Sequence, residues 1–347
     1  PAHRGAIMGN ISMVISVAPA IGPTMAGVVL QFTTWRGVFA LMVPIGLLML
    51  AFGAWRMVNV NELIQVPLDG WSVPLTVLGF GGLVYGLSLI GDATVPQAEL
   101  IGSFVVGVLA LAAFLWRQLL LARHDRGPLL DLRAFQHSAF TVSVIVMALA
   151  MMALFGTVII LPLLLQQALH LPPLTVGLML LPGGLLMGLL GPVTGRLFDR
   201  VGPRPLMLPA SVVIAGVFWL LSTIQLSTPW WFVMAAHMAM SASFAFMFTP
   251  LFTIALGSLP KHLYSHGSAI VGTVQQVGGA FGTAVFVTAL ASQSAAAQAA
   301  GASAEAALLV GSRVAFLGAG AVWTLAIIAT LFIKKPELDG DEPAMHH

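Results

Sequence analysis

The sequence contains no cysteine, and only 7% of its 347 residues are Asp, Glu, Lys or Arg. The absence of cysteine excludes disulfide bridges and thiolate metal ligands. The charged fraction is far below the roughly 25% of soluble domains. No loop concentrates Lys and Arg with aromatic residues as a nucleic-acid groove would require. A Gly-x-x-x-x-Gly-Lys run for binding nucleotide phosphates is also absent, which argues against a protein driven by ATP.

Apolar residues dominate instead, with 59% of the chain hydrophobic and a mean hydropathy of +0.98. About 20 apolar residues in a helix cross a hydrocarbon core of roughly 30 Å. Such runs recur along the whole chain, so we predict an all-α polytopic membrane protein with the lipid bilayer as its surroundings. The ten predicted spans are Ala6 to Gln31, Gly37 to Met57, Ser72 to Ile90, Leu100 to Leu121, Phe140 to Gln166, Val176 to Leu197, Leu206 to Ile224, Trp230 to Leu256, Ser268 to Ser292 and Ala307 to Ile333.

The connections between these spans are short and polar. The longest are predicted at Val58 to Trp71, Ala122 to Ala139 and the alanine-rich Gln293 to Glu305. If the spans alternate in direction, every Lys and Arg except Arg36 and Arg313 falls on one side of the membrane. The positive-inside rule makes that side cytoplasmic. Because the number of spans is even, both chain ends are predicted to be cytoplasmic in a multi-pass protein of the cell (inner or plasma) membrane.

The stretch SVAPAIGPTMAGVVLQ interrupts the first apolar run with two prolines and two glycines. Ala18, Gly22 and Ala26 are four residues apart, so they form a groove of small residues on one helix face. Pro19 and Pro23 bend the helix, which a membrane bundle tolerates when neighbouring groups bond the freed carbonyls. On spacing alone, plain tight helix packing is the better explanation of the pattern.

Five segments resemble, in order, the drug:proton antiporters of the major facilitator superfamily. APAIGPTMAG at 18–27 resembles the antiporter motif of their fifth span, and TTWRGVFALMVPIG at 33–46 resembles the segment after that span in the fourteen-span branch (EmrB/QacA type). PLLDLRAF at 128–135 is similar to the lead-in to the ninth span. GPVTGRLFDRVGPRPLML at 191–208 resembles the second-half copy of the cytoplasmic Gly-x-x-x-Asp-Arg-x-Gly loop, and VQQVGGAFGTAV at 274–285 the thirteenth span.

The resemblance implies a major facilitator helix bundle that is truncated at its N-terminal end. The ten spans would then be the fifth through fourteenth, with the C-terminal six-helix half complete and the first four helices missing from this sequence. Residues 1–57 would hold the last two helices of the N-terminal half, 58–123 two central linker helices, 124–333 the C-terminal half and 334–347 a polar cytoplasmic tail. Ala18 and Ala26 stand where the family more often has glycine.

The function implied by this resemblance is secondary active transport: proton-coupled efflux of hydrophobic or cationic drugs by alternating access. The implied partners are a drug-like small molecule and protons, with the proton gradient as energy source and no cofactor. In the family the coupling acid and a key arginine come from early spans, and none of the twelve acids here lies mid-span. We therefore do not expect this chain to be a working antiporter by itself.

Two other classes of protein are considered. A membrane scaffold that does not transport, or a half-transporter that depends on a partner, is the alternative interpretation. A membrane enzyme is not predicted, because the sequence has no His-Glu-x-x-His run and no paired intramembrane Asp. His262 and His266 are four apart, but with no acid or third ligand nearby they predict no metal site.

The resemblance also assigns roles to two groups of residues. The antiporter motif would seal the interface between the two halves through Ala18, Pro19, Gly22, Pro23, Ala26 and Gly27. The cytoplasmic loop would act as a conformational latch through Gly195, Asp199, Arg200, Gly202 and Arg204, since flanking cations and an acid at a helix end make charge-assisted bonds that can break. In the simpler interpretation the arginines only set topology and Asp199 is a solvated neighbour.

Intramembrane polar side chains are costly, so they are candidates for the substrate pathway. Gln275 and Gln276 lie in the ninth predicted span and His237 in the eighth. His237 and Ser241 share a helix face, with further candidates Met234 and Phe248, and with Phe244, at helical spacing. Deformable methionine and aromatic walls suit bulky apolar or cationic drugs. The alternative for His237 is a core histidine bonded to a neighbouring carbonyl.

Overall fold

The computed structural model describes residues 21–22, 24–57, 69–90, 95–124 and 128–331. Nine helices in these ranges are long and apolar enough to cross a membrane, which confirms the predicted all-α polytopic fold. They are α2 (Trp35–Arg56), α3 (Ser72–Leu89), α4 (Gln97–Arg123), α5 (Ser138–Leu163), α6 (Pro173–Val201), α7 (Arg204–Leu221), α8 (Trp230–Gly257), α9 (Tyr264–Ala299) and α10 (Ala304–Leu331). Short 3₁₀ turns cover η1 (Leu132–Gln136) and η3 (Lys261–Leu263), and a wider π turn, η2 (Leu164–Ala168), extends α5. The first predicted span lies partly outside the described residues. In the part of that span that is described, residues 21–22 and 24–32 are helical.

The predicted alanine-rich loop from Gln293 to Glu305 is wrong for most of its length. Helix α9 continues to Ala299, and α10 begins at Ala304. Alanine has the highest intrinsic helix propensity, so a run of alanines after a membrane span extends the helix rather than ending it. The turn between α9 and α10 is therefore only four residues long. It includes Gly301, whose φ of 91° favours glycine.

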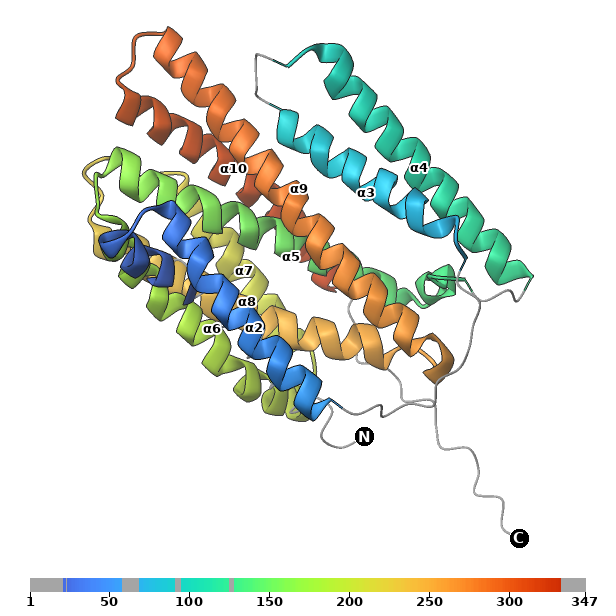
Figure 1. Ribbon diagram of the computed structural model, residues 1–347. Helices are drawn as coiled ribbons and strands as arrows, with labels where there is room; N and C mark the ends of the chain where they lie inside the picture. The colour runs from blue at the N-terminus through green and yellow to red at the C-terminus, as the bar shows by residue number, and fades with distance from the viewer. Residues whose placement is uncertain (1–20, 23, 58–68, 91–94, 125–127, 332–347) are drawn as a thin grey trace.

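Helices α5 to α10 form one bundle with a continuous apolar core (Figure 1). The main packing pairs are α5 with α9, α6 with α8, α9 with α10 and α7 with α10. Aromatic side chains fill the centre, where the fully buried groups include Trp323, Phe218, Phe244 and Phe316. Many apolar side chains remain on the outside, as Leu325 does with 68% of its surface exposed. An apolar outer surface over membrane-length helices is what a lipid environment requires.

Helices α7 and α10 are held together by hydrogen bonds at both ends. Arg204 at the start of α7 donates to the carbonyl oxygen of Leu331 at the end of α10 (3.1 Å). Arg313 of α10 donates to the carbonyl oxygen of Ser222, which comes directly after α7 (3.0 Å). Each arginine therefore bonds a backbone carbonyl near the end of the neighbouring helix, as cations near helix C-termini often do. Between these ends, the indole N–H of Trp323 donates to the carbonyl oxygen of Ser211 (3.0 Å).

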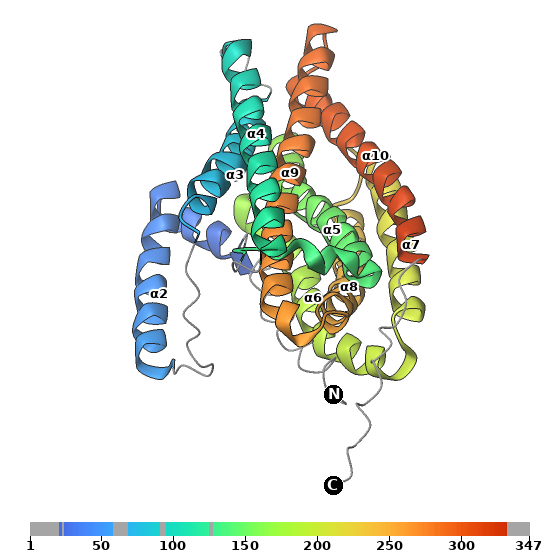
Figure 2. The same cartoon turned by 90° about the vertical axis from the view of Figure 1, so that its right-hand side faces the viewer.

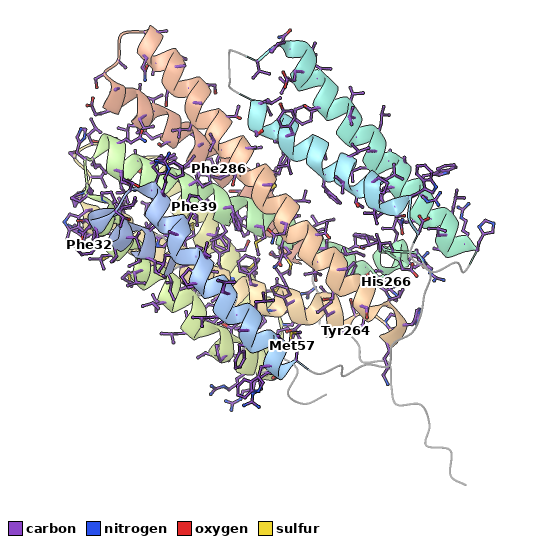
Figure 3. All side chains as sticks on the ribbon, in the orientation of Figure 1. Phe32, Phe39, Met57, Tyr264, His266 and Phe286 are labelled. Carbon is purple, nitrogen blue, oxygen red and sulfur yellow. The ribbon has the colours of Figure 1, made fainter. Side chains whose placement is uncertain are left out.

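Glycine brings α5 and α9 into close backbone contact. A β-carbon at Gly282 would overlap the backbone of Met152, and one at Gly278 would come within 2.9 Å of the carbonyl oxygen of Ala148. The ring of Phe286, labelled in Figure 3, lies directly over Gly156 of α5. The two backbones can therefore approach closely because these glycines have no side chains, as is common where membrane helices pack together.

Helices α3 and α4 form a separate hairpin that lies beside α9 (Figure 2). Gly82 and Gly107 face one another across the hairpin, so the two backbones approach closely. Helix α2 has no buried residue and lies apart from the α5–α10 bundle in Figure 2. The bundle, the hairpin and α2 therefore differ in how much of their surface they bury within the described residues.

Candidate functional site

His237 lies at the contact between α8 and α6. Its ring and the hydroxyl of Ser241 lie against Gly183, where a β-carbon would overlap the ring and come within 3.0 Å of the hydroxyl. The exposed fractions are 9% for His237 and 3% for Ser241. In the part of the chain that the structure describes, Nδ1 of His237 has no hydrogen-bond partner. The ring is thus a buried polar group with an unused bonding position, which is costly and favours a functional use.

The aromatic residues predicted beside His237 are packed in the core. Phe248 is 3% exposed and stacks on Phe244 with ring centroids 5.6 Å apart. Phe244 meets Trp323 of α10 edge to face at 5.8 Å. Met234 is partly buried against the same core. Phe244 therefore joins α8 to α10, and in this conformation Ser241 and Phe248 are buried.

The two predicted glutamines of α9 point in different directions. Gln275 is half-buried, and its amide nitrogen is enclosed without a hydrogen-bond partner in the described residues. Gln276 is exposed on another side of the helix. Neither Nδ1 of His237 nor the amide nitrogen of Gln275 bonds the other residue, since both atoms lack a partner among the described residues. The structure therefore does not bring the predicted polar candidates together into one hydrogen-bonded site.

A cavity of about 280 Å³ lies between α5, α9 and α10. Its lining is apolar and includes the half-exposed Val285 and Val322 as well as the buried Trp323. The lining residues are Leu149, Met152, Ala153, Val285, Phe286, Ala289, Val314, Ala315, Gly318, Ala319, Val322 and Trp323. The prediction from sequence missed this cavity, because its residues are the ordinary apolar ones of any span. The signal that was available is the small size of Ala153, Ala289 and Gly318 on facing helices.

The antiporter motif reaches the bundle through its last residues. Gly27 is buried, and a β-carbon there would come within 2.9 Å of the carbonyl oxygen of Pro173 at the start of α6. The hydroxyl of Thr24 donates to the carbonyl oxygen of Gly177 in α6 (2.8 Å). Ala26 is half-buried, whereas Gly22 is exposed with open space around it. Ala18, Pro19 and Pro23 lie outside the described residues.

The predicted latch occupies the turn between α6 and α7. Gly202 ends α6 with a φ of 79°, a left-handed conformation that glycine adopts most easily, and Gly195 is buried one to two turns earlier. Asp199 and Arg200 are exposed on the last turn of α6. Asp199 takes part in none of the ion pairs found among the described residues. Arg204 is directed to the end of α10 through its bond to Leu331.

Comparison with known proteins identifies one family and several related resistance and export proteins. The profile described as Major Facilitator Superfamily matches residues 1–283. The lincomycin resistance protein LmrB of Listeria monocytogenes serovar 1/2a is 40% identical over 289 residues, covering 83% of this chain and 60% of the relative. LmrB of Bacillus subtilis is 36% identical over 347 residues, covering 98% of this chain and 72% of the relative.

A third relative is the multidrug export protein EmrB of Haemophilus influenzae, which is 30% identical over 289 residues, covering 82% of this chain and 56% of the relative. This chain thus spans about 60% of the length of the Listeria relative. The profile match covers most of the chain, and the similarity to an EmrB protein agrees with the resemblance carried by the motifs. The chain therefore belongs to the major facilitator superfamily, in the branch that contains the EmrB-type drug exporters.

Proposed function

We propose that the protein containing this chain exports hydrophobic or cationic drugs, lincomycin among them, in exchange for protons. The observation that carries the proposal is the 40% identity over 289 residues to a lincomycin resistance protein. A bundle of apolar spans that buries a few polar side chains is the architecture from which secondary transporters build a pathway with alternating access. The substrates named in relatives and the low charge of the spans favour drug-like molecules over strongly anionic ones.

The orientation proposed from the charge distribution places both chain ends in the cytoplasm of the cell that carries the protein in its membrane. The turn with Asp199 then lies on the cytoplasmic side, and the turn between α9 and α10 on the outer side. His237 is separated from the outer end of α8 by two helical turns, since α8 begins at Trp230. We propose His237, Gln275 and Gln276 as polar groups of the pathway.

Drug accumulation tests the proposed function. The gene would be expressed in a drug-sensitive bacterial host, and intracellular lincomycin measured against an empty vector. We expect lower accumulation in cells that carry the gene, and loss of the difference when a protonophore collapses the proton gradient. Equal accumulation at matched membrane abundance of the protein would contradict drug efflux. A difference that survives the protonophore would contradict proton coupling.

The apolar cavity between α5, α9 and α10 supports the hydrophobic part of this proposal. Its volume of about 280 Å³ lies just below the roughly 300–1,000 Å³ of drug-sized sites, so it fits the apolar part of a drug. The contributing helices are all long and apolar enough to cross a membrane, and the lining offers no charged group. We propose that this cavity binds the apolar part of the substrate.

Filling the cavity is expected to weaken drug binding. Gly318 lines it, and no atom lies within 4 Å of the place where a β-carbon would be, so the side chain of Gly318→Leu starts in open space beside the cavity. We expect the KM for lincomycin efflux to rise about tenfold, which corresponds to about 1.4 kcal/mol of lost apolar contact. Gly216→Leu is the control, because Gly216 of α7 is equally uncrowded and does not line the cavity. The same KM in both variants would show that the cavity takes no part in binding.

The latch assigned to the turn between α6 and α7 is tested by removing one charge. Asp199→Asn is expected to lower the efflux rate about tenfold at normal membrane abundance, since charge-assisted bonds contribute about 1.5–3 kcal/mol. Glu99→Gln is the matched control, because Glu99 is an exposed acid in the first turn of α4, at the opposite end of the spans. Unchanged efflux in Asp199→Asn would leave the arginines with a role in topology alone.

A further inference from the structure

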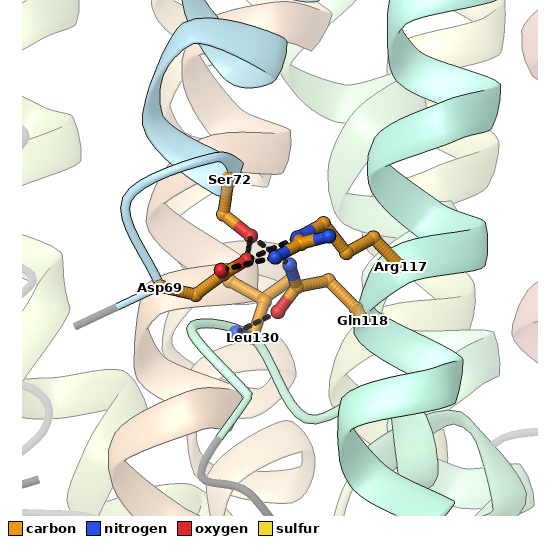
Figure 4. Close-up of polar contacts among 5 residues, drawn as sticks. All are labelled: Asp69, Ser72, Arg117, Gln118 and Leu130. Atoms are coloured by element: carbon orange, nitrogen blue, oxygen red, sulfur yellow. Dashed lines mark hydrogen bonds and ion pairs between the residues drawn. The ribbon is translucent and has the colours of Figure 1, made fainter. Parts of the chain in front are cut away.

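A polar cluster joins the two helices of the α3–α4 hairpin (Figure 4). Nε and Nη2 of Arg117, near the end of α4, donate to the two carboxylate oxygens of Asp69, each at 2.5 Å. The hydroxyl of Ser72, the first residue of α3, donates to the same carboxylate at 2.5 Å. The hydrogen bonds from Arg117 and then from Ser72 hold the pKa of Asp69 well below its ordinary value. A charged, bidentate pair of this kind fixes geometry as well as adding energy.

Gln118 extends the cluster from the hairpin to the α5–α10 bundle. Its side chain is fully buried. The amide nitrogen donates to the hydroxyl of Ser72 (2.6 Å), and the amide oxygen accepts from the backbone N–H of Leu130 (3.0 Å). One side chain thus bonds the beginning of the hairpin on one side and the segment before α5 on the other.

The segment that contains Leu130 is a fixed part of the bundle. Leu130 packs against the core, and Ala134 is a fully buried member of it. Between them, the carboxylate of Asp131 accepts from the backbone N–H of Arg133 (2.9 Å) and so caps η1. The ring of Phe135 meets Phe140 of α5 edge to face at 5.5 Å. Leu130 therefore offers Gln118 an anchor that is itself held by packing.

We propose that Gln118 is a positioning residue that fastens the α3–α4 hairpin to the α5–α10 bundle, so that hairpin and bundle move as one rigid body. The contact of α3 with α9 adds a second point of attachment. Helix α2, which precedes the hairpin in the chain, buries none of its residues. If the protein transports by the proposed alternating access, the hairpin thus travels with α5–α10 when the two halves rock.

The physical reason lies in the burial of the amide. Each buried polar group needs its partner, because a lost partner leaves an unsatisfied donor or acceptor away from water. Removing the Gln118 amide would strand the N–H of Leu130 and leave Ser72 with its bond to Asp69 alone. The hairpin would keep its internal ion pair but lose its bonded connection to the bundle.

Distances between spin labels test the proposal, and the chain contains no cysteine that would compete for the label. The pair Leu109→Cys in α4 and Leu325→Cys in α10 reports the hairpin against the bundle, since both positions are more than 60% exposed. The pair Leu178→Cys in α6 and Leu325→Cys reports the bundle alone. Distance distributions would be recorded by double electron–electron resonance in lipid nanodiscs. We expect narrow distributions of similar width from both pairs.

Gln118→Ala is expected to broaden the hairpin-to-bundle distribution at least about twofold, since the anchor is lost, while the bundle pair stays unchanged. Gln97→Ala is the matched control, because Gln97 is an exposed glutamine at the other end of α4. If Gln118→Ala also broadens the distance distribution of the bundle pair, Gln118→Glu is tested in its place. Glutamate keeps the acceptor for the N–H of Leu130 and loses the amide donor, so we expect an intermediate broadening of the hairpin-to-bundle distribution.

Two results would overturn the proposal. One is a hairpin-to-bundle distribution in the unmutated protein that is already as broad as that between α2, labelled at Leu50→Cys, and Leu325→Cys. The other is an unchanged distribution in Gln118→Ala, or in the deciding Gln118→Glu variant. Because the readout is a distance, it is independent of drug transport, and either failure would leave the proposed function standing.

Discussion

Replacing Trp323 by alanine is expected to lower the free energy of unfolding of the α5–α10 bundle by about 3–5 kcal/mol. Trp323 is 1% exposed and contacts Phe244 edge to face. Its indole N–H also donates to the carbonyl oxygen of Ser211, which links α10 to α7. The substitution therefore leaves a cavity in the centre of the bundle and removes the bond to a buried carbonyl at the same time.

Unfolding by sodium dodecyl sulfate in mixed micelles measures this change. Trp116→Ala is the matched control, because Trp116 of α4 is 66% exposed and its loss leaves no internal cavity. We expect the control to remain within about 1 kcal/mol of the unmutated protein. Similar losses in the two variants would show that the described core does not hold the bundle together.

Gly282→Ala is expected to destabilise the same bundle by about 1–3 kcal/mol, although it adds a single methyl group. The added carbon would overlap the backbone of Met152, and a backbone cannot turn aside as a flexible side chain can. Helices α5 and α9 must then move apart along their whole contact. The measurement is the same unfolding titration.

Gly272→Ala provides the control on the same helix. No atom lies within 4 Å of the β-carbon position at Gly272. Alanine also has the higher helix propensity, by about 1 kcal/mol, so this variant is expected to be equally or slightly more stable. Equal destabilisation in both variants would mean that close contact between α5 and α9 is not what requires glycine at position 282.

The spans could be predicted from the sequence because they depend on a local property, the length of an apolar run. Helix α8 begins at the predicted Trp230 and ends one residue after the predicted Leu256. The prediction was wrong after Ser292. The strongly apolar run ends there, but the alanines that follow continue the helix beyond the membrane-length segment. Local helix propensity, rather than hydropathy, decides that boundary.

The polar candidates were harder to interpret, because their partners come from distant parts of the chain. His237 was recognisable as an intramembrane polar group, but its position against Gly183 depends on how α6 packs on α8. The cavity between α5, α9 and α10 has no polar signature at all. Gln118 bonds Ser72, which lies 46 residues earlier in the chain, and no local sequence pattern predicts a contact over that distance.

The central proposal is that the protein exchanges drug for protons, and proteoliposomes test it most directly. The full-length gene product would be reconstituted, a pH gradient imposed, and lincomycin and internal pH monitored together. One proton moving through 100 mV supplies about 2.3 kcal/mol, enough for a drug gradient of roughly 50-fold. We predict that lincomycin moves against its gradient while protons move in the opposite direction, and that adding lincomycin accelerates dissipation of the pH gradient. Lincomycin movement that ignores the pH gradient, with no effect of the drug on proton flux, would contradict the account.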